Sequence, residues 1–192
     1  MPTDAAPSRV GPVVRGALGF GAVSLVAYGV WAFAGRALSS TVGEGGFYAV
    51  LAAVFLGLTG FALHPLLPGP RSFLRFTLVF VPAFLAYAAV WCGFWFKLKF
   101  GLGEWLGSLG GCVAFAAVAG AMLGGFRAFP AAAAVLFVGH SAGYFLGGPI
   151  HYTLKNYHAL GILGWGLLYG LGFGAGIGFA FHAFQKARRS ET

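Results

Sequence analysis

The residues of this sequence most suited to chemistry fall on one side of a predicted helix. His140 lies near the middle of an apolar run, and polar or ionisable side chains recur beyond it at about whole helical turns. Because an ionisable side chain at the middle of a bilayer is costly, such a residue marks a candidate site. We expect a binding site or pathway for a small solute or ion, formed by His140, Ser141, Tyr144, His151, Lys155 and His158.

A glycine and proline motif falls within the same run. Pro149, after Gly147 and Gly148, would leave the carbonyl of Phe145 without its usual helical donor. Interrupted helices of this kind recur at the binding sites of transporters. We therefore expect a broken helix beside the polar residues. In the alternative, His140 only hydrogen-bonds to a neighbouring helix, and the motif ends its helix early.

Two other kinds of chemistry are weighed against this site. Residues 139–143 match the G-x-S-x-G motif, with Ser141 as the nucleophile, but that motif requires a strained turn between strand and helix. We therefore expect no enzyme. His64 and His182 lie at similar predicted depths and could hold haem b between two helices, which makes an electron-transfer subunit an alternative. Otherwise we predict no cofactor, and no Cys and His spacing predicts a metal site.

The elements that position these residues are long apolar stretches. Six stretches of 20 residues or more lack Lys, Arg, Asp and Glu, and about 20 apolar residues cross a hydrocarbon core. The chain is 59% hydrophobic and only 8% charged, which is too little polar surface for a soluble globule. We predict an all-α integral membrane bundle of six transmembrane helices, with a disordered tail at 1–11, a basic tail at 186–192, and spans at about 13–35, 46–67, 74–96, 105–126, 130–150 and 159–183.

The basic residues predict the orientation of the chain. Alternating the sides of six spans places eight of them on one side: Arg9, Arg15, Arg71, Arg75, Arg127, Lys186, Arg188 and Arg189. Four fall on the other side: Arg36, Lys97, Lys99 and Lys155. The positive-inside rule then places both termini in the cytoplasm, and we expect the bacterial inner membrane. The net charge of +8 thus has a topological origin, and we expect no nucleic-acid partner.

A weak internal repeat suggests three repeated hairpins. Pro12, Pro70 and Pro130 precede or open alternate spans, and the pair Gly43-Glu44 recurs 60 residues later as Gly103-Glu104. In one interpretation Glu44 and Glu104 line the outer mouth of a pathway. In the other, each carboxylate only stabilises the N-terminus of its helix.

Glycines and phenylalanines predict how the helices pack. Gly166, Gly170, Gly174 and Gly178 recur at every fourth residue, and small residues let membrane helices approach closely. Such faces can pack within one chain or between subunits, so a homo-oligomer or a larger membrane complex is an open alternative. We expect the bulky residues of the third span to face lipid, including Phe73, Phe76, Phe80, Phe84, Phe94, Trp95 and Phe96.

Together these features predict a small channel, transporter or membrane-embedded substrate-binding subunit. Its partners would be the lipid bilayer and a small solute or ion. Besides the haem-binding subunit, the alternative is a structural accessory subunit that docks onto a larger membrane complex through its glycine faces.

Overall fold

The computed structural model describes residues 9–191, and almost all of them are helical. The long helices are α1 (Val10–Leu63), α2 (Ser72–Leu98), α3 (Leu102–Leu123), α4 (Phe129–Thr153) and α5 (His158–Arg189). Three short 3₁₀ segments connect them, at His64–Leu66, Phe126–Ala128 and Lys155–Tyr157. All five long helices are long and apolar enough to cross a membrane, which indicates a membrane-embedded protein.

Both predicted tails differ from the structure where it describes them. Residues 1–8 of the expected N-terminal tail, and Thr192, lie outside the described residues. Helix α1 begins at Val10, within the segment expected to be disordered. Helix α5 continues to Arg189, so the basic residues after Gln185 extend the last helix by another turn.

Helix α1 turns back on itself at Gly43. A straight helix of its 54 residues would be about 80 Å long, but Gly43 has φ 74° and ψ 173°, outside the helical region. Glycine adopts this positive φ without the cost that a Cβ imposes. The two arms, 10–42 and 44–63, lie against each other. Phe20 of the first arm stacks on Phe55 of the second, with ring centroids 5.4 Å apart. The first arm thus runs antiparallel to the second.

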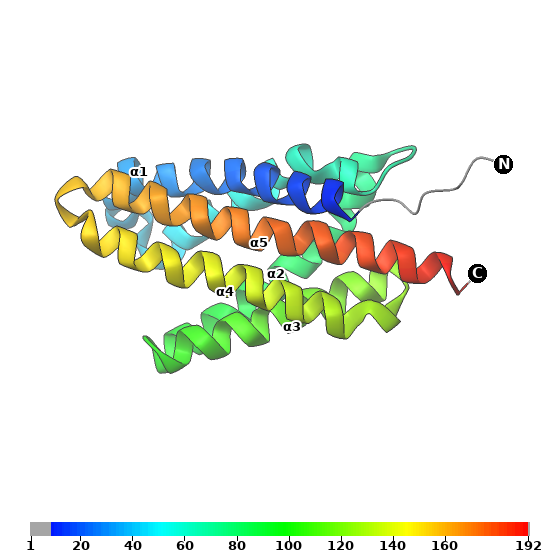
Figure 1. Cartoon of the computed structure of the whole chain (residues 1–192). Coiled ribbons are helices and arrows are strands. Elements are labelled where there is room, and N and C mark those ends of the chain that lie inside the picture. Colours follow the sequence, from blue (N-terminus) through cyan, green and yellow to red (C-terminus); the bar gives the residue numbers. More distant parts are fainter. Residues whose placement is uncertain (1–8, 192) are drawn as a thin grey trace.

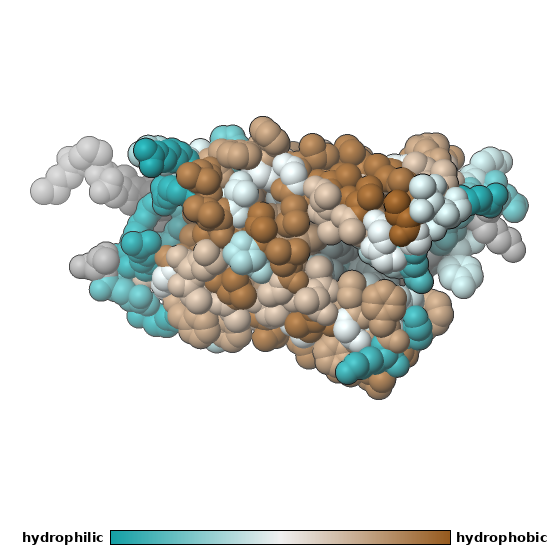
Figure 2. Space-filling model, turned by 180° about the vertical axis from the view of Figure 1, so that it is seen from behind, coloured by the Kyte–Doolittle hydropathy of each residue, from teal (hydrophilic) through white to brown (hydrophobic). Residues whose placement is uncertain are grey.

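The helices form a bundle with both described ends on the same side (Figure 1). Helix α5 lies between the first arm of α1 and α4, and the α2–α3 pair packs against α4 and α1. We call the end that holds residues 9–12 and 186–191 the terminal end. The distal end holds the Gly43 turn, the α2–α3 turn and the α4–α5 turn (Figure 1). An apolar band separates more hydrophilic ends on the face in Figure 2.

The glycines of α5 pack within the chain, on two faces. One face carries Gly166, Gly170, Gly174 and Gly178, which meet Tyr28, Ser24, Gly16 and Pro12 of α1. The other face carries Gly172 and Gly176, which meet Gly139 and Leu136 of α4. Several of these contacts join backbone to backbone, as between Gly172 and Gly139. The glycine stripes therefore hold α1, α5 and α4 together within one chain.

Three of the six phenylalanines of α2 lie in the core, contrary to the sequence-based prediction for them. Phe76, Phe80 and Phe84 are buried, whereas Phe73 and Phe96 are exposed as expected. The prediction was wrong because lipid and a protein core accept the same apolar side chains, so residue type alone does not separate them. The buried rings pack together with Phe20, Phe115, Phe173, Phe181 and Phe184. Cys92 and Cys112 are both free thiols.

Candidate functional site

His140 lies at the centre of a hydrogen-bonded cluster between helices. Its side chain, on α4, is completely buried. The Nε2 atom is 2.6 Å from the hydroxyl of Tyr87 on α2, and the Nδ1 atom is 2.5 Å from the hydroxyl of Ser108 on α3. A neutral imidazole has one donor and one acceptor nitrogen, so one of these hydroxyls donates to the ring and the other accepts from it.

Two further hydroxyls extend this cluster. Tyr169 of α5 lies with its hydroxyl 3.3 Å from that of Tyr87, and the Ser141 hydroxyl lies 2.9 Å from that of Ser108. The result is a continuous polar line through four helices, which we call the His140 network: Tyr169, Tyr87, His140, Ser108 and Ser141. Every bond in it joins hydroxyl or imidazole groups. Such a line satisfies its own buried polar atoms without a carboxylate, ammonium or guanidinium group.

Tyr144 links this network to the distal end. Its ring lies parallel to that of His140, with centroids 5.9 Å apart and an interplanar angle of 11°. Its hydroxyl donates to Glu104 over 3.1 Å, and the other carboxylate oxygen accepts from the backbone N–H of Gly101 over 2.9 Å. Glu104 thus caps α3 and also binds Tyr144. Glu44, its predicted partner at the outer mouth, is exposed beside the Gly43 turn.

Aromatic nitrogens without partners surround Tyr144. The rings of Trp91 and Trp165 lie 5.9 Å and 5.2 Å from its ring, and His151 lies 5.7 Å from Trp165. The Nε1 atoms of both tryptophans and Nδ1 of His151 are buried, with no hydrogen-bond partner among the described residues. An indole N–H only donates, and an unpaired buried donor costs about 1–3 kcal/mol. We call these five residues the distal vestibule: Trp91, Glu104, Tyr144, His151 and Trp165.

The structure brings some of the predicted site residues together and separates others. His140 and Ser141 lie in the network, and Tyr144 lies directly beside it. His151 and His158 form a second pair near the distal end, with ring centroids 5.7 Å apart. Lys155 lies in the connecting 3₁₀ segment, and His158 begins α5, so neither belongs to the helix that carries His140.

The predicted break in this helix is wrong. Helix α4 continues from Phe129 to Thr153 with Pro149 inside it. Pro149 lies in the last turns, so the lost backbone bond falls close to the helix end, where the ladder stops in any case. The position of Gly147 has a packing reason, because a Cβ there would strike the Trp165 ring and backbone.

Three network residues were missed by the sequence analysis. Tyr87, Ser108 and Tyr169 lie on three different helices and follow no shared spacing. Each is a single hydroxyl in the middle of an apolar stretch, and this isolation was the available signal. A polar group that is kept in such a stretch needs a partner from another helix.

The alternative chemistries find less support in the geometry. Ser141 lies within a regular helix, no strand occurs in residues 9–191, and its hydroxyl bonds to Ser108, so the motif at 139–143 forms no nucleophile elbow. The Nδ1 atom of His64 is 3.0 Å from the Ser72 hydroxyl. His182 lines a pocket to which His64 contributes no lining atoms, so the two imidazoles do not face one shared cavity there. The described residues also include no group of three or more His, Cys, Asp or Glu side chains placed to hold a metal ion.

No protein-family model matches this chain, and neither a curated protein nor a solved structure shows significant similarity to it. Its function is therefore inferred from the geometry of the site alone.

Proposed function

We propose that the protein is a membrane-embedded transporter, channel or substrate-binding subunit for a small solute or ion, with His140 at its centre. The carrying observation is the buried His140 network, whose imidazole stacks against the ring of Tyr144, while the Tyr144 hydroxyl bonds to Glu104 nearer the distal end. Polar and ionisable groups inside a bundle are costly and mark substrate, ion or proton pathways in membrane proteins. A site of this kind at mid-bundle fits a ligand that enters from the distal end.

The proposed topology has six crossings, with the two arms of α1 counted separately. The antiparallel arms support this count, because the turn at Gly43 returns the chain toward the terminal end. Both termini are then cytoplasmic in a bacterial inner membrane. The basic residues Arg15, Lys186 and Arg189 gather at the terminal end, as the positive-inside rule requires of a cytoplasmic face.

The chemistry of the distal vestibule favours a small uncharged polar solute. Trp91 and Trp165 offer two buried N–H donors, and Glu104 offers carboxylate oxygens. A solute that has both acceptor and donor groups would satisfy all of them once the surrounding rings move apart to admit it. The His140 network also suits a proton, because hydroxyls and an imidazole in series can each give and take one.

The terminal half of the bundle is closed by aromatic rings. Phe80, Phe115 and Phe173 are fully buried between the network and the terminal end. Phe173 lies directly against His140, with centroids 5.2 Å apart. In a binding subunit these rings would stay packed. In a transporter or channel they must move apart to let the solute pass. Phe173→Ala should therefore raise the flux of a channel and leave the affinity of a binding subunit nearly unchanged.

Vesicle measurements test the proposal directly. Purified protein in liposomes is exposed to glycerol or urea while swelling is followed by light scattering, and proton entry is followed with an enclosed pH-sensitive dye. Thermal unfolding with each solute tests binding without flux. We expect wild-type protein to exceed empty vesicles in permeability or to be stabilised by a solute, and His140→Ala to lose at least about tenfold of that activity, since about 1.4 kcal/mol corresponds to tenfold.

Two further variants keep this test sharp. His64→Ala, whose ring bonds to Ser72 outside the network, is the matched control and should retain activity. Tyr87→Phe removes a single hydroxyl and should fold even if His140→Ala does not. The proposal is overturned if neither flux nor solute-induced stabilisation is found, or if the activity is the same in wild type, His140→Ala and Tyr87→Phe.

A further inference from the structure

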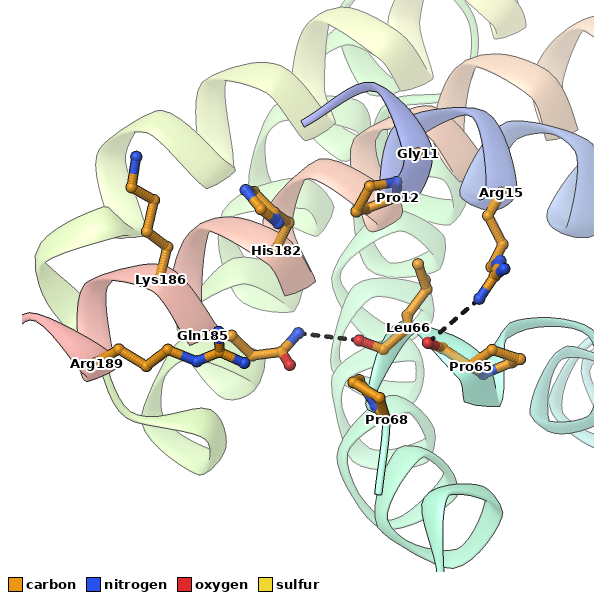
Figure 3. Close-up of a pocket in the computed structure, with 10 residues that line it drawn as sticks. All are labelled: Gly11, Pro12, Arg15, Pro65, Leu66, Pro68, His182, Gln185, Lys186 and Arg189. Atoms are coloured by element: carbon orange, nitrogen blue, oxygen red, sulfur yellow. Dashed lines mark hydrogen bonds between the residues drawn. The ribbon is translucent and has the colours of Figure 1, made fainter. Parts of the chain in front are cut away.

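A separate pocket opens at the terminal end of the bundle. It lies between the start of α1, the segment after α1, and the end of α5, and its volume is about 430 Å³ (Figure 3). Ligand sites commonly have volumes of about 300–1,000 Å³. The residues that line it are Gly11, Pro12, Arg15, Pro65, Leu66, Pro68, His182, Gln185, Lys186 and Arg189. We call it the terminal pocket.

The lining of the terminal pocket is basic. Arg15, Lys186 and Arg189 carry positive charge, His182 can carry one, and the lining includes neither Asp nor Glu. In Figure 3, Arg15 from α1 and Arg189 from α5 approach from opposite sides, with Pro65 and Leu66 between them. Arg15 donates only a long bond of 3.5 Å to the Pro65 carbonyl. Guanidinium groups prefer phosphate or carboxylate oxygens, so the pocket suits an anion.

Gln185 holds the terminal pocket in shape, and His182 lies at its wall. Gln185 donates to the carbonyls of Leu66 and Phe181 over 2.9 Å and 2.8 Å, which ties α5 to the segment after α1. His182 Nε2 is buried and has no hydrogen-bond partner among the described residues. Because this atom is not accessible from the open pocket, a ligand bonds to it only after the imidazole turns.

An apolar groove continues from the pocket along α1. It is lined by Val10, Gly11, Val14, Arg15, Leu18, Gly19 and Ala62, and it shares Gly11 and Arg15 with the pocket. Val14 and Leu18 are 47% and 63% exposed. Such a groove, open on the side of the bundle, is apolar enough to hold part of a hydrocarbon chain.

We infer that the terminal pocket binds the phosphoryl headgroup of an anionic phospholipid, with one acyl chain along the α1 groove. Basic pockets between helices at the cytoplasmic side of a membrane are suited to anionic headgroups. Charge placed only for topology needs neither a cavity nor an adjoining apolar groove. Arg127 illustrates that simpler case, because it is exposed at the same end and bonds to the Ser190 hydroxyl over 3.5 Å. This inference rests on the proposed orientation, with the terminal end cytoplasmic, and does not depend on the His140 site.

The test compares lipids and variants in the full-length purified protein. Thermal unfolding is measured with phosphatidylglycerol, with phosphatidylcholine and with inorganic phosphate, and bound lipid is counted by native mass spectrometry. We expect phosphatidylglycerol to raise the unfolding temperature by several degrees more than the other two. Each basic residue near a membrane surface contributes about fivefold in affinity, so Arg15→Gln with Lys186→Gln should weaken phosphatidylglycerol binding by about 25-fold.

Arg127→Gln is the matched control and should retain the affinity of wild type for phosphatidylglycerol. Equal weakening by Arg127→Gln would reduce the effect to net charge and overturn the inference. Equal stabilisation by inorganic phosphate would replace the lipid with a free anion, and equal stabilisation by phosphatidylcholine would remove the requirement for negative charge. Leu18→Gln, which places a polar group in the groove, should weaken phosphatidylglycerol binding and leave any binding of inorganic phosphate unchanged.

Discussion

The His140 network and the terminal pocket lie along the same helix, α5, but they use polar groups in opposite ways. Tyr169 joins the network through a hydroxyl, and its neighbours there are hydroxyls and one imidazole. Nearer the helix end, His182 faces a pocket lined by guanidinium and ammonium groups. The difference follows the cost of charge in a bilayer, which is largest in the middle and small near the water. A histidine in the middle must find neutral partners, whereas one near the end can share its surroundings with cations.

Substitution of the glycines between helices should disrupt both regions and have the largest effect. In Gly139→Ala the new methyl would strike the carbonyl of Gly172, and in Gly178→Ala it would strike that of Pro12. Backbone cannot rotate away as a side chain can, so we expect each variant to lose about 3 kcal/mol of stability. Thermal unfolding in detergent measures this loss. Gly148→Ala, with no atom within 4 Å of the added carbon, should unfold like wild type, and an equal loss in all three would contradict the packing.

Removal of each histidine should separate the two regions. His140→Ala leaves the hydroxyls of Tyr87 and Ser108 without their shared partner, so we expect a loss of about 2–3 kcal/mol. His182→Ala breaks no hydrogen bond of Nε2 and should lower stability by less than about 1 kcal/mol. Chemical denaturation of both variants in one detergent gives the comparison. Similar losses would show that the network holds the bundle no more firmly than the pocket does.

Salt should act on the charged region alone. The distance over which charges interact falls from about 10 Å at 0.1 M salt to about 3 Å at 1 M. We therefore expect the stabilisation by phosphatidylglycerol to shrink by at least about half between 0.05 M and 0.5 M sodium chloride. Any flux that depends on His140 should change less over the same range, since the His140 network contains no carboxylate, ammonium or guanidinium group to screen. The prediction is contradicted if salt changes the flux and leaves the binding of phosphatidylglycerol unchanged.

Substitution of Glu104 and of Glu44, which the sequence analysis paired, should have different effects, and these are the smallest effects predicted here. Glu104 accepts from Tyr144 and caps α3 at Gly101, so Glu104→Gln should cost about 1 kcal/mol and lower flux several-fold. Glu44 is exposed, and Glu44→Gln should change neither property measurably. Flux and thermal unfolding of the two variants, prepared side by side, test this. Equal effects of the two substitutions would instead support the prediction that Glu44 and Glu104 together line the outer mouth of a pathway.

The positions of the helices could be read from the sequence because hydrocarbon excludes charge. Uncharged runs locate α2, α3, α4 and α5, and Gly43 marks the turn within α1. The direction in which each helix faces could not be read so well. In water the hydrophobic effect drives apolar residues into the core. In lipid there is no such preference, so a phenylalanine can face either the core or the lipid, and Phe80 is buried in the core.

The candidate site was only partly visible in the sequence for a related reason. His140, Ser141 and Tyr144 lie on one helix, where spacing reveals a shared face. Tyr87, Ser108 and Tyr169 each come from a different helix, and nothing in their numbering relates them before the bundle forms. The terminal pocket is assembled from three separate segments of chain, so it left no pattern to read.

The glycine contacts of α5 have a mechanical consequence. They bring α1, α5 and α4 together backbone to backbone, whereas rings of α2 and α3 contact these helices through side chains. Tyr87 lies on α2 and Ser108 on α3, and both bond to His140 on α4. If α2 and α3 move away from α4 as one body, both hydrogen bonds of the His140 ring must break together. His140 therefore couples α2 and α3 to α4 through a single ring, and neither helix can move away from it alone without costing the ring one of its two hydrogen bonds.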